Sequence, residues 1–312
     1  MALESYYKVA SADVVSLADA IRARGGTSAS LAWPIGFISA VSDISGSAVL
    51  ESLSVSQNGH YTPSAGIDGF SDVVVSVSGG GGSNDNFKIA CGVMSGSIFD
   101  AEVSTVRANG FISNLAITDV EMLSVNTIGY GAFQSCSNLT TASFPACVSI
   151  ENGAFMNCSN LTTASFPACA SIGDYAFYSC RNLTTSFPSC TIIGISAFQS
   201  CNNLTTVSFP ACASIGSYAF QSCSNLTTAS FPACIRINGY AFQHCIKLES
   251  IYLLSTSVVS LWSTTAFQRT PISLSSLIGH FGSIYVLSSL VEAYKSATYW
   301  SVYSDRITAY EE

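Results

Sequence analysis

The chain has 312 residues, of which 48% are hydrophobic, so it is long enough to bury a sizeable core. Only 10% of the residues are charged, where roughly 25% is usual, and the net charge is -8. This composition argues against a nucleic-acid-binding or basic membrane-binding surface, and it favours neutral partners such as glycans or proteins.

The N-terminal end carries no basic segment followed by a long apolar stretch. No apolar run anywhere in the chain approaches the roughly 18 residues of a membrane-spanning helix. We therefore expect no signal peptide and no membrane insertion.

Residues 1–47 are expected to form a small helical segment that attaches the protein to a partner. Val14, Leu17 and Ile21 make an apolar stripe at helical spacing, which Gly25 ends. Two short helices of this kind would make a docking element.

Residues 48–78 are expected to form a small β-module. An Asn-Gly pair favours a hairpin turn, and the alternation of Val73, Val75 and Val77 is typical of a half-buried strand. The Gly-rich residues 79–86 then predict a flexible linker.

A unit of 22 residues recurs through the middle of the chain. Its aligned phenylalanines are spaced by 22 residues except for one step of 21, and they are Phe111, Phe133, Phe155, Phe177, Phe198, Phe220 and Phe242. The short step comes from the copy that reads LTTSFPSC at 183–190, where other copies read LTTASFPAC. A period of 20–29 residues with short apolar alternation is typical of a leucine-rich-repeat-like solenoid. We expect a mostly β solenoid with short helical turns over 111–267, an N-terminal cap over 87–110, and a C-terminal cap with a strand and a helix over 268–312.

Each copy is expected to present one apolar and one polar side. In one copy, Leu139, Ala142 and Phe144 are predicted to point inward, while the threonines and the serine between them face solvent. Pro145 then ends the strand. A single coil buries its apolar side only against its neighbours, so the coils must stack and the array needs caps.

Eleven of the twelve cysteines fall at repeat positions and are expected to form two columns of buried free thiols. In-register side chains of stacked coils do not face each other as a disulfide requires, and their 11-residue separation does not suit a metal site. We expect no cofactor. The two columns are Cys136, Cys158, Cys180, Cys201, Cys223 and Cys245, and Cys147, Cys169, Cys190, Cys212 and Cys234.

Catalysis is not expected. The three histidines are far apart in the sequence, and no nucleophile or phosphate-loop motif is present.

The outward threonines and serines are the candidate binding face of the solenoid. They are Thr141, Ser143, Thr163, Ser165, Thr185, Thr206, Ser208, Thr228 and Ser230. Three interpretations stay open, namely a polar strand surface repeated by duplication, a multivalent face for glycan or protein, and a surface that orders water. Tyr175, Tyr218 and Tyr240 form a further column, which either stacks on sugars or packs on the solenoid edge.

The unit IGxxAFxxCxxLxxxxFPxC resembles the BspA-like class of bacterial leucine-rich repeats, whose members are surface or secreted adhesive proteins. Residues 13–44, 55–82 and 283–307 resemble segments of tail-associated proteins from phages and prophages of Gram-positive bacteria. Together these resemblances imply a binding protein of the repeat class that is carried on a phage particle.

From these resemblances we expect a non-enzymatic virion-associated tail or fibre protein, assembled in the bacterial cytoplasm. Its N-terminal segment would attach to other virion proteins, and its solenoid would bind a bacterial surface glycan or protein. The alternative is a structural or decoration protein of the virion without a host ligand. A homo-oligomer such as a trimer is a further expectation from fibre-like appendages.

Overall fold

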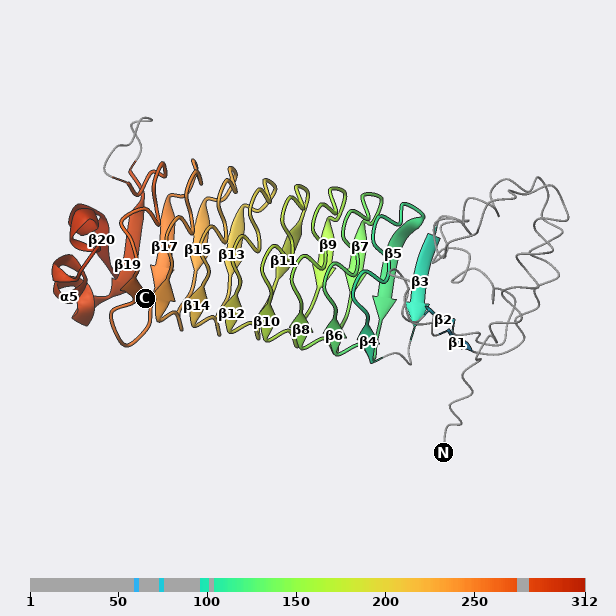
Figure 1. Ribbon diagram of the computed structural model, residues 1–312. Coiled ribbons are helices and arrows are strands. Elements are labelled where there is room, and N and C mark those ends of the chain that lie inside the picture. The colour runs from blue at the N-terminus through green and yellow to red at the C-terminus, as the bar shows by residue number, and fades with distance from the viewer. Residues whose placement is uncertain (1–58, 62–72, 76–95, 101–103, 274–280, 312) are drawn as a thin grey trace, which may run out of the picture.

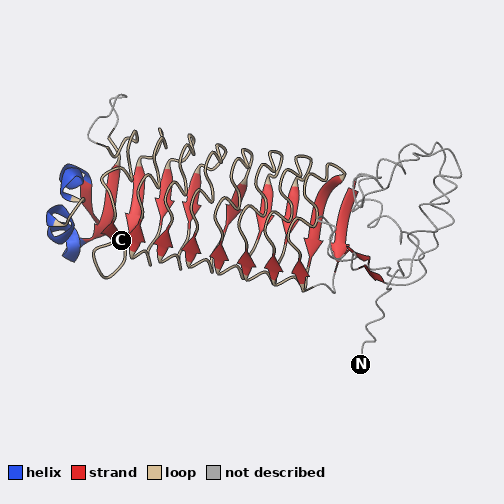
Figure 2. Cartoon of the chain, viewed as in Figure 1, coloured by secondary structure: helices blue, strands red, loops and turns tan. Residues whose placement is uncertain are grey.

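The computed structural model describes residues 59–61, 73–75, 96–100, 104–273 and 281–311. The expected helical segment 1–47 and linker 79–86 lie outside these residues. Of the expected β-module, two pieces are described: β1 (Gly59–Tyr61) pairs antiparallel with β2 (Val73–Val75). From β3 onward the chain winds as a row of stacked coils, and helices occur at the C-terminal end (Figures 1 and 2).

The solenoid has two strand-bearing sides, and its strands pair parallel with their equivalents in the next coil, except between β11 and β13. One side is an eight-stranded sheet of two-residue strands: β4 (Thr105–Val106), β6 (Thr127–Ile128), β8 (Ser149–Ile150), β10 (Ser171–Ile172), β12 (Ile192–Ile193), β14 (Ser214–Ile215), β16 (Arg236–Ile237) and β18 (Ser260–Leu261).

The other side consists of two five-stranded sheets. The first holds β3 (Gly96–Asp100), β5 (Ile117–Met122), β7 (Thr141–Ser143), β9 (Thr163–Ser165) and β11 (Thr184–Ser186). The second holds β13 (Thr206–Ser208), β15 (Thr228–Ser230), β17 (Ser250–Leu253), β19 (Ser283–Leu287) and β20 (Ile307–Tyr310). The solenoid expected from the 22-residue period is therefore confirmed.

The third side of each coil is a run of hydrogen-bonded turns, and the described repeats contain no helix there. The amide of Cys136 bonds back to Phe133 at 3.1 Å within its own coil, whereas the amide of Phe133 bonds to Ala154 of the next coil at 2.7 Å. Because alternate amides turn toward the neighbouring coil, the i to i−4 bonds of a helix cannot form. The short helical turns expected from the sequence are therefore turns only.

Two columns of phenylalanine rings run along the interior. Phe133 stacks on Phe155 with centroids 5.1 Å apart, and Phe144 stacks on Phe166 at 5.5 Å. The columns meet edge to face, as between Phe133 and Phe144 at 5.8 Å and 60°. These rings are fully buried together with the repeat's leucine, isoleucine and alanine. Each copy therefore contributes the same set of apolar side chains to one continuous core.

The cysteines fill the remaining interior positions as buried free thiols, and each column makes its own hydrogen bond. In the first column the thiol donates to the phenylalanine carbonyl of the preceding coil, as from Cys158 to Phe133 at 3.0 Å. In the second it donates to a carbonyl two residues ahead, as from Cys169 to Ser171 at 3.3 Å. A thiol suits these positions because it is small, largely apolar and still able to donate to an otherwise dry carbonyl.

The coil with one residue fewer interrupts the strand ladder. β11 pairs with β9 so that Thr184 lies opposite Thr163 and Thr185 lies opposite the inward Ala164. The hydrogen-bonded sheet then ends at β11 and resumes at β13, while the eight-stranded sheet runs on through β12. Thr185, expected on the outward face, is a wrong assignment: the deletion moves it to the alanine position, where its hydroxyl donates to the Ala164 carbonyl at 2.7 Å.

The C-terminal end is closed by β19, η1 (Ser288–Leu290), α5 (Val291–Ser296), η2 (Ser301–Arg306) and β20. Tyr294, Trp300 and Tyr303 are buried against the last coil. The amide of Val259 donates to the Tyr294 hydroxyl at 3.0 Å, and the Trp300 indole donates to the Val259 carbonyl at 2.6 Å. These aromatic side chains therefore supply both apolar cover and polar partners to the end of the solenoid.

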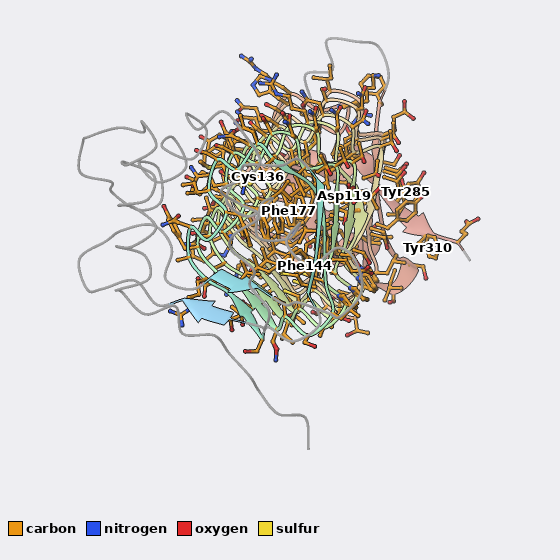
Figure 3. The ribbon with its side chains drawn as sticks, turned by 90° about the vertical axis from the view of Figure 1, so that its right-hand side faces the viewer. Asp119, Cys136, Phe144, Phe177, Tyr285 and Tyr310 are labelled. Atoms are coloured by element: carbon orange, nitrogen blue, oxygen red, sulfur yellow. The ribbon has the colours of Figure 1, made fainter. Side chains whose placement is uncertain are left out.

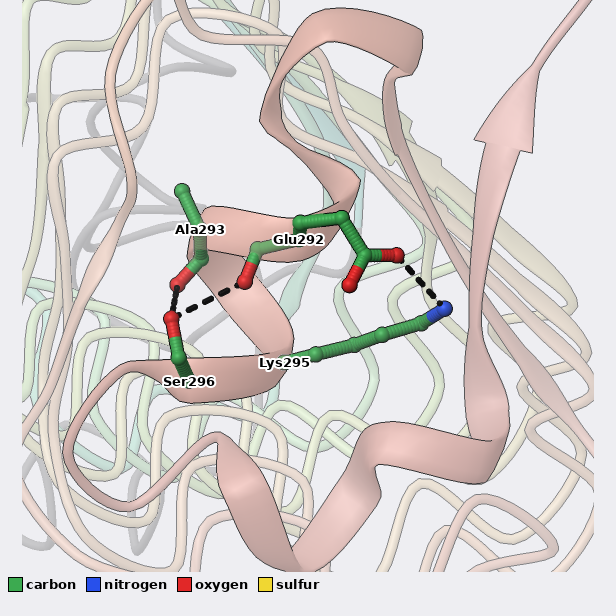
Figure 4. Close-up of polar contacts among 4 residues, drawn as sticks. All are labelled: Glu292, Ala293, Lys295 and Ser296. Carbon is green, nitrogen blue, oxygen red and sulfur yellow. Dashed lines mark hydrogen bonds and ion pairs between the residues drawn. The ribbon is translucent and has the colours of Figure 1, made fainter.

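Glu292, Lys295 and Ser296 of helix α5 make polar contacts with one another and with the helix backbone (Figure 4). Lys295 and Glu292 form an ion pair at 3.1 Å, and the hydroxyl of Ser296 donates to the carbonyls of Glu292 and Ala293. An exposed pair of this kind adds little stability, so aromatic burial holds the helix in place. No described helix has the length and apolar character needed to cross a membrane.

One prediction concerns the glycines where neighbouring coils touch. A Cβ on Gly216 would lie 2.5 Å from the backbone of Gly194, whereas a Cβ on Gly239 would have its nearest neighbour at 3.4 Å. We expect Gly216→Ala to lower the free energy of unfolding by about 1–3 kcal/mol through overpacking. Gly239→Ala is the matched control and should cost less than about 1 kcal/mol in the same denaturant titration; equal losses would contradict the close approach.

A second prediction concerns alkaline pH. Burial raises the pKa of Cys147 to about 11 and that of Cys190 to about 12, against about 8.5 for an unfolded thiol. Because the folded state disfavours the thiolate, stability is complete below pH about 8.5 and is lost as pH rises toward the folded pKa values, by up to about 1.4 kcal/mol per pH unit for each thiol.

We therefore expect urea titrations between pH 7.5 and 10 to show a steep fall in the free energy of unfolding. Cys190→Ala should start from lower stability and fall less steeply, because one proton fewer is released on unfolding. A wild-type curve that is flat above pH 8.5 would contradict the burial of the thiols.

Candidate binding face

The outer surface of the two five-stranded sheets is the candidate binding face, called here the hydroxyl face. Each repeat strand places its first and third side chains outward and its middle one in the core, as in β9, where Ala164 is buried and Thr163 and Ser165 are exposed. The outward residues are Thr141, Ser143, Thr163, Ser165, Thr184, Thr206, Ser208, Thr228 and Ser230. Successive rows are one strand spacing apart, about 4.8 Å.

Two kinds of hydroxyl lie on these strands. In one kind, a threonine just before a strand donates its hydroxyl to a backbone carbonyl of the preceding coil. Thr162 donates to the carbonyl of Thr140 at 3.1 Å, and Thr227 donates to that of Thr205 at 3.0 Å. In contrast, within the described part of the chain no side-chain hydrogen bond is made by Thr163, Ser165, Thr206, Ser208, Thr228 or Ser230. These six hydroxyls are free to meet a ligand.

In the shortened coil, one threonine has the position of a free hydroxyl but the hydrogen bond of a hydroxyl that anchors the strand. Thr184 lies in register with the free Thr163, yet it donates to the Thr162 carbonyl at 2.7 Å as an anchoring threonine does. The row of β11 therefore lacks a free threonine hydroxyl, and the free threonines form two groups on either side of it. Thr163 and Thr206, which border this row, are both exposed.

An acidic residue lies on β5, the second strand from the N-terminal end of the hydroxyl face. Asp119 on β5 lies in register with Thr141. Its carboxylate accepts from the hydroxyls of Thr118 at 2.9 Å, Thr140 at 2.9 Å and Thr141 at 2.5 Å. Thr141, a predicted site residue, is therefore bound within the protein.

Three tyrosines close the C-terminal end, and this tyrosine cluster was missed in the sequence. Tyr252 and Tyr285 stack with centroids 4.8 Å apart, and Tyr310 meets Tyr252 edge-on at 5.9 Å. Asp119, Tyr285 and Tyr310 lie on the same side of the solenoid when it is seen along its axis (Figure 3). Tyr252 lies opposite Ser230 in the strand register, so extending the repeat by 22 residues would have found it. Tyr285 and Tyr310 follow the repeats and carry no such signal.

The structure does not bring the predicted tyrosine column to this face. Tyr175, Tyr218 and Tyr240 begin the turn segment that follows the eight-stranded sheet. All three have left-handed backbone, with φ of 57°, 61° and 61°, where Gly131 and Gly153 stand in earlier coils. Tyr218 and Tyr240 stack on each other at 4.9 Å, which is packing along the edge of the solenoid.

The described residues offer no metal site, since nowhere among them do three or more His, Cys, Asp or Glu side chains gather closely enough to hold an ion. What the hydroxyl face presents is a rigid, uncharged array of donors and acceptors between an acidic end and an aromatic end. Such an array can offer hydrogen bonds to a ligand.

Residues 87–184 and 170–286 match the BspA type leucine-rich repeat region, in six copies. A leucine-rich repeat protein from Bacteroides ovatus is 19% identical with a TM-score of 0.53, over 74% of this chain and 64% of that one. The leucine-rich repeat protein of T. pallidum is 21% identical with a TM-score of 0.43, over 57% of this chain and 78% of that one. The pneumococcal vaccine antigen PcpA is 14% identical with a TM-score of 0.27, over 69% and 78%. A search among curated proteins found no match. The likeness to the B. ovatus protein concerns the fold.

Proposed function

The chain belongs to the family of BspA-type leucine-rich repeats, and from this premise we propose that it is a non-enzymatic binding protein whose hydroxyl face recognises a bacterial surface glycan or protein. The observation that carries this proposal is the set of hydroxyls without a protein partner on Thr163, Ser165, Thr206, Ser208, Thr228 and Ser230. Hydroxyls of this kind bond to water in the free protein, and a ligand with matching polar groups can replace that water.

The arrangement of these hydroxyls suits a ligand that is itself repetitive. They recur on strands held in register by parallel pairing, so their positions are fixed before binding and little ordering entropy is lost. Each contact is weak, but contacts repeated along one ligand add through effective concentration. A polysaccharide chain or an extended protein surface offers such repetition.

The low charge of the face also supports a neutral ligand. Between Thr141 and Ser230 the outward strand positions carry hydroxyl groups, and charge appears only at Asp119 and Glu121 at one end. The tyrosine cluster at the other end provides half-buried aromatic rings, on which an apolar sugar face or an aliphatic side chain can stack. Both ends thus give the ligand a direction along the solenoid.

The proposal predicts that charge on the hydroxyl face abolishes binding. We expect Thr206→Lys and Thr228→Lys, in the full chain, to weaken binding to cells or purified surface polysaccharide of Gram-positive bacteria by at least about tenfold, because each buries an unpaired ammonium against the ligand. Ser214→Lys on the eight-stranded sheet adds the same charge to another side of the coil and should leave binding unchanged. Equal loss in all three variants, or no loss in any, would exclude the hydroxyl face as the binding surface.

We further propose that the protein works on a phage or prophage particle, with residues 1–82 attaching it to other virion proteins. This part of the proposal is supported by the sequence resemblance of residues 13–44 and 55–82, which lie mostly outside the described residues. The alternative, a decoration protein, is favoured by the same scarcity of charge, since a neutral array also packs readily on other subunits.

Electron microscopy of particles from the native host, labelled with an antibody against residues 83–312, separates these roles. We expect label clustered at the tail tip. Label spread over the head or along the tube would favour decoration, and particles without label would overturn the virion proposal while leaving the binding experiment above unaffected.

A further inference from the structure

A hollow of about 450 Å³ lies where the C-terminal cap meets the last strand of the eight-stranded sheet. One wall is β18 with its flanking residues 258–262, and the other is the loop 297–300 between α5 and η2. We call it the cap hollow. The hydroxyl face is formed by different sheets, so the two surfaces are distinct.

Two large aromatic side chains line the cap hollow and remain open to solvent. The side chain of Trp262 is 61% exposed and that of Tyr299 is 45% exposed, although both belong to segments that pack against a core. Tyr299 has a left-handed backbone with φ of 65°, which costs a non-glycine residue roughly 1–2 kcal/mol. The hollow thus has an exposed aromatic ring on each of its two walls.

The Trp262 ring is already oriented. The guanidinium of Arg236 lies 5.5 Å from the centroid of the indole, within range of a cation–π contact. Arg236 extends from β16, the strand next to β18, so the contact ties the ring to the sheet. The indole therefore presents a partly fixed surface to the hollow and loses little freedom when a ligand stacks on it.

The edge of β18 supplies polar groups to the same hollow. Ser260 and Trp262 donate their amides to the neighbouring coil, so the peptide of Leu261 between them points away from the sheet, toward the cap. Two residues earlier, on the same edge of the strand, the Val259 amide donates to the Tyr294 hydroxyl and the Val259 carbonyl accepts from the Trp300 indole. Within the described ranges, no such partner reaches Leu261. The Leu261 amide and carbonyl are therefore unpaired at this edge, although Leu261 is only 5% exposed, and Ser260 and Thr298 add hydroxyls to the lining.

From this geometry we propose that the cap hollow is a second binding site, which takes one or two rings of a neutral sugar. The apolar faces of a sugar ring match the Trp262 and Tyr299 rings, and its hydroxyls match the polar groups of Ser260, Thr298 and the Leu261 backbone. The volume suits a mono- or disaccharide. None of the residues that line the hollow is charged, which suits a neutral sugar.

A peptide that adds a strand to β18 fits the hollow less well. Strand addition draws its affinity from a row of backbone hydrogen bonds, and the Val259 groups that would begin this row are already bound by the cap. Only the Leu261 position is open. The edge is therefore protected against further strands, while a compact ring needs no more than this one pair.

The test uses the full chain and the methyl glycosides of glucose, galactose, mannose and N-acetylglucosamine, with their β-linked disaccharides. Saturation-transfer NMR reports binding, and the indole N–H signal of Trp262, assigned by its loss in Trp262→Ala, reports the place. We expect at least one sugar to shift that signal, and we expect Trp262→Ala to weaken binding of that sugar by about tenfold or more. Because Trp262 is exposed, this variant should retain the melting temperature of the parent.

A control variant keeps the result specific. Tyr178→Ala changes a half-buried tyrosine outside the cap hollow and should leave the sugar-induced shift of the Trp262 signal unchanged. Because the Trp262 signal reports the cap hollow and not the hydroxyl face, failure of the hydroxyl-face proposal would leave this one standing. The proposal is overturned if none of these sugars shifts the Trp262 signal, or if Trp262→Ala binds the sugar as the parent does. It is also overturned if an extended peptide displaces the sugar and shifts the backbone amide signal of Leu261.

Discussion

Hydrogen bonding between consecutive coils, in register, is the constraint on which the rest of this structure depends. No coil satisfies its own backbone: the amide of Phe133 needs Ala154, and Ser171 of β10 needs both Ser149 and Ile192 beside it. Once this register is fixed, identical side chains must lie above one another. The phenylalanine stacks and the cysteine columns follow from it, since a column can hold only groups that tolerate their own copy as a neighbour.

The same constraint explains why the interior is built from thiols and aromatic rings. A polar residue repeated at every coil would bury many unsatisfied groups, whereas Cys158 satisfies itself on the Phe133 carbonyl of the neighbouring coil. It also explains why one missing residue acts locally. Thr185 moves into the alanine position and the ladder breaks at β11, yet the short strands and the turns carry the register past the break.

The candidate binding surfaces lie where polar groups are not used by the hydrogen bonds between coils. On the hydroxyl face, Thr162 and Thr227 donate to backbone carbonyls of the neighbouring coil, whereas Thr163 and Thr228 keep their hydroxyls for solvent or ligand. At the cap, aromatic side chains bind the Val259 edge and leave that of Leu261 open between Trp262 and Tyr299. In both places a regular lattice of backbone bonds fixes the position of the groups that remain.

The sequence alone determined the solenoid, its 22-residue period, the inward and outward positions of its strands, and the two cysteine columns, because a repeat states the same local preference many times. Tertiary structure decided what a single copy does not encode. The third side of each coil forms turns and not helical turns, because alternate amides there donate to carbonyls of the next coil. Packing between coils also set the register of Thr185. Tertiary structure also brought Tyr252, Tyr285 and Tyr310 together and formed the cap hollow, because these residues meet only where segments distant in the sequence pack side by side.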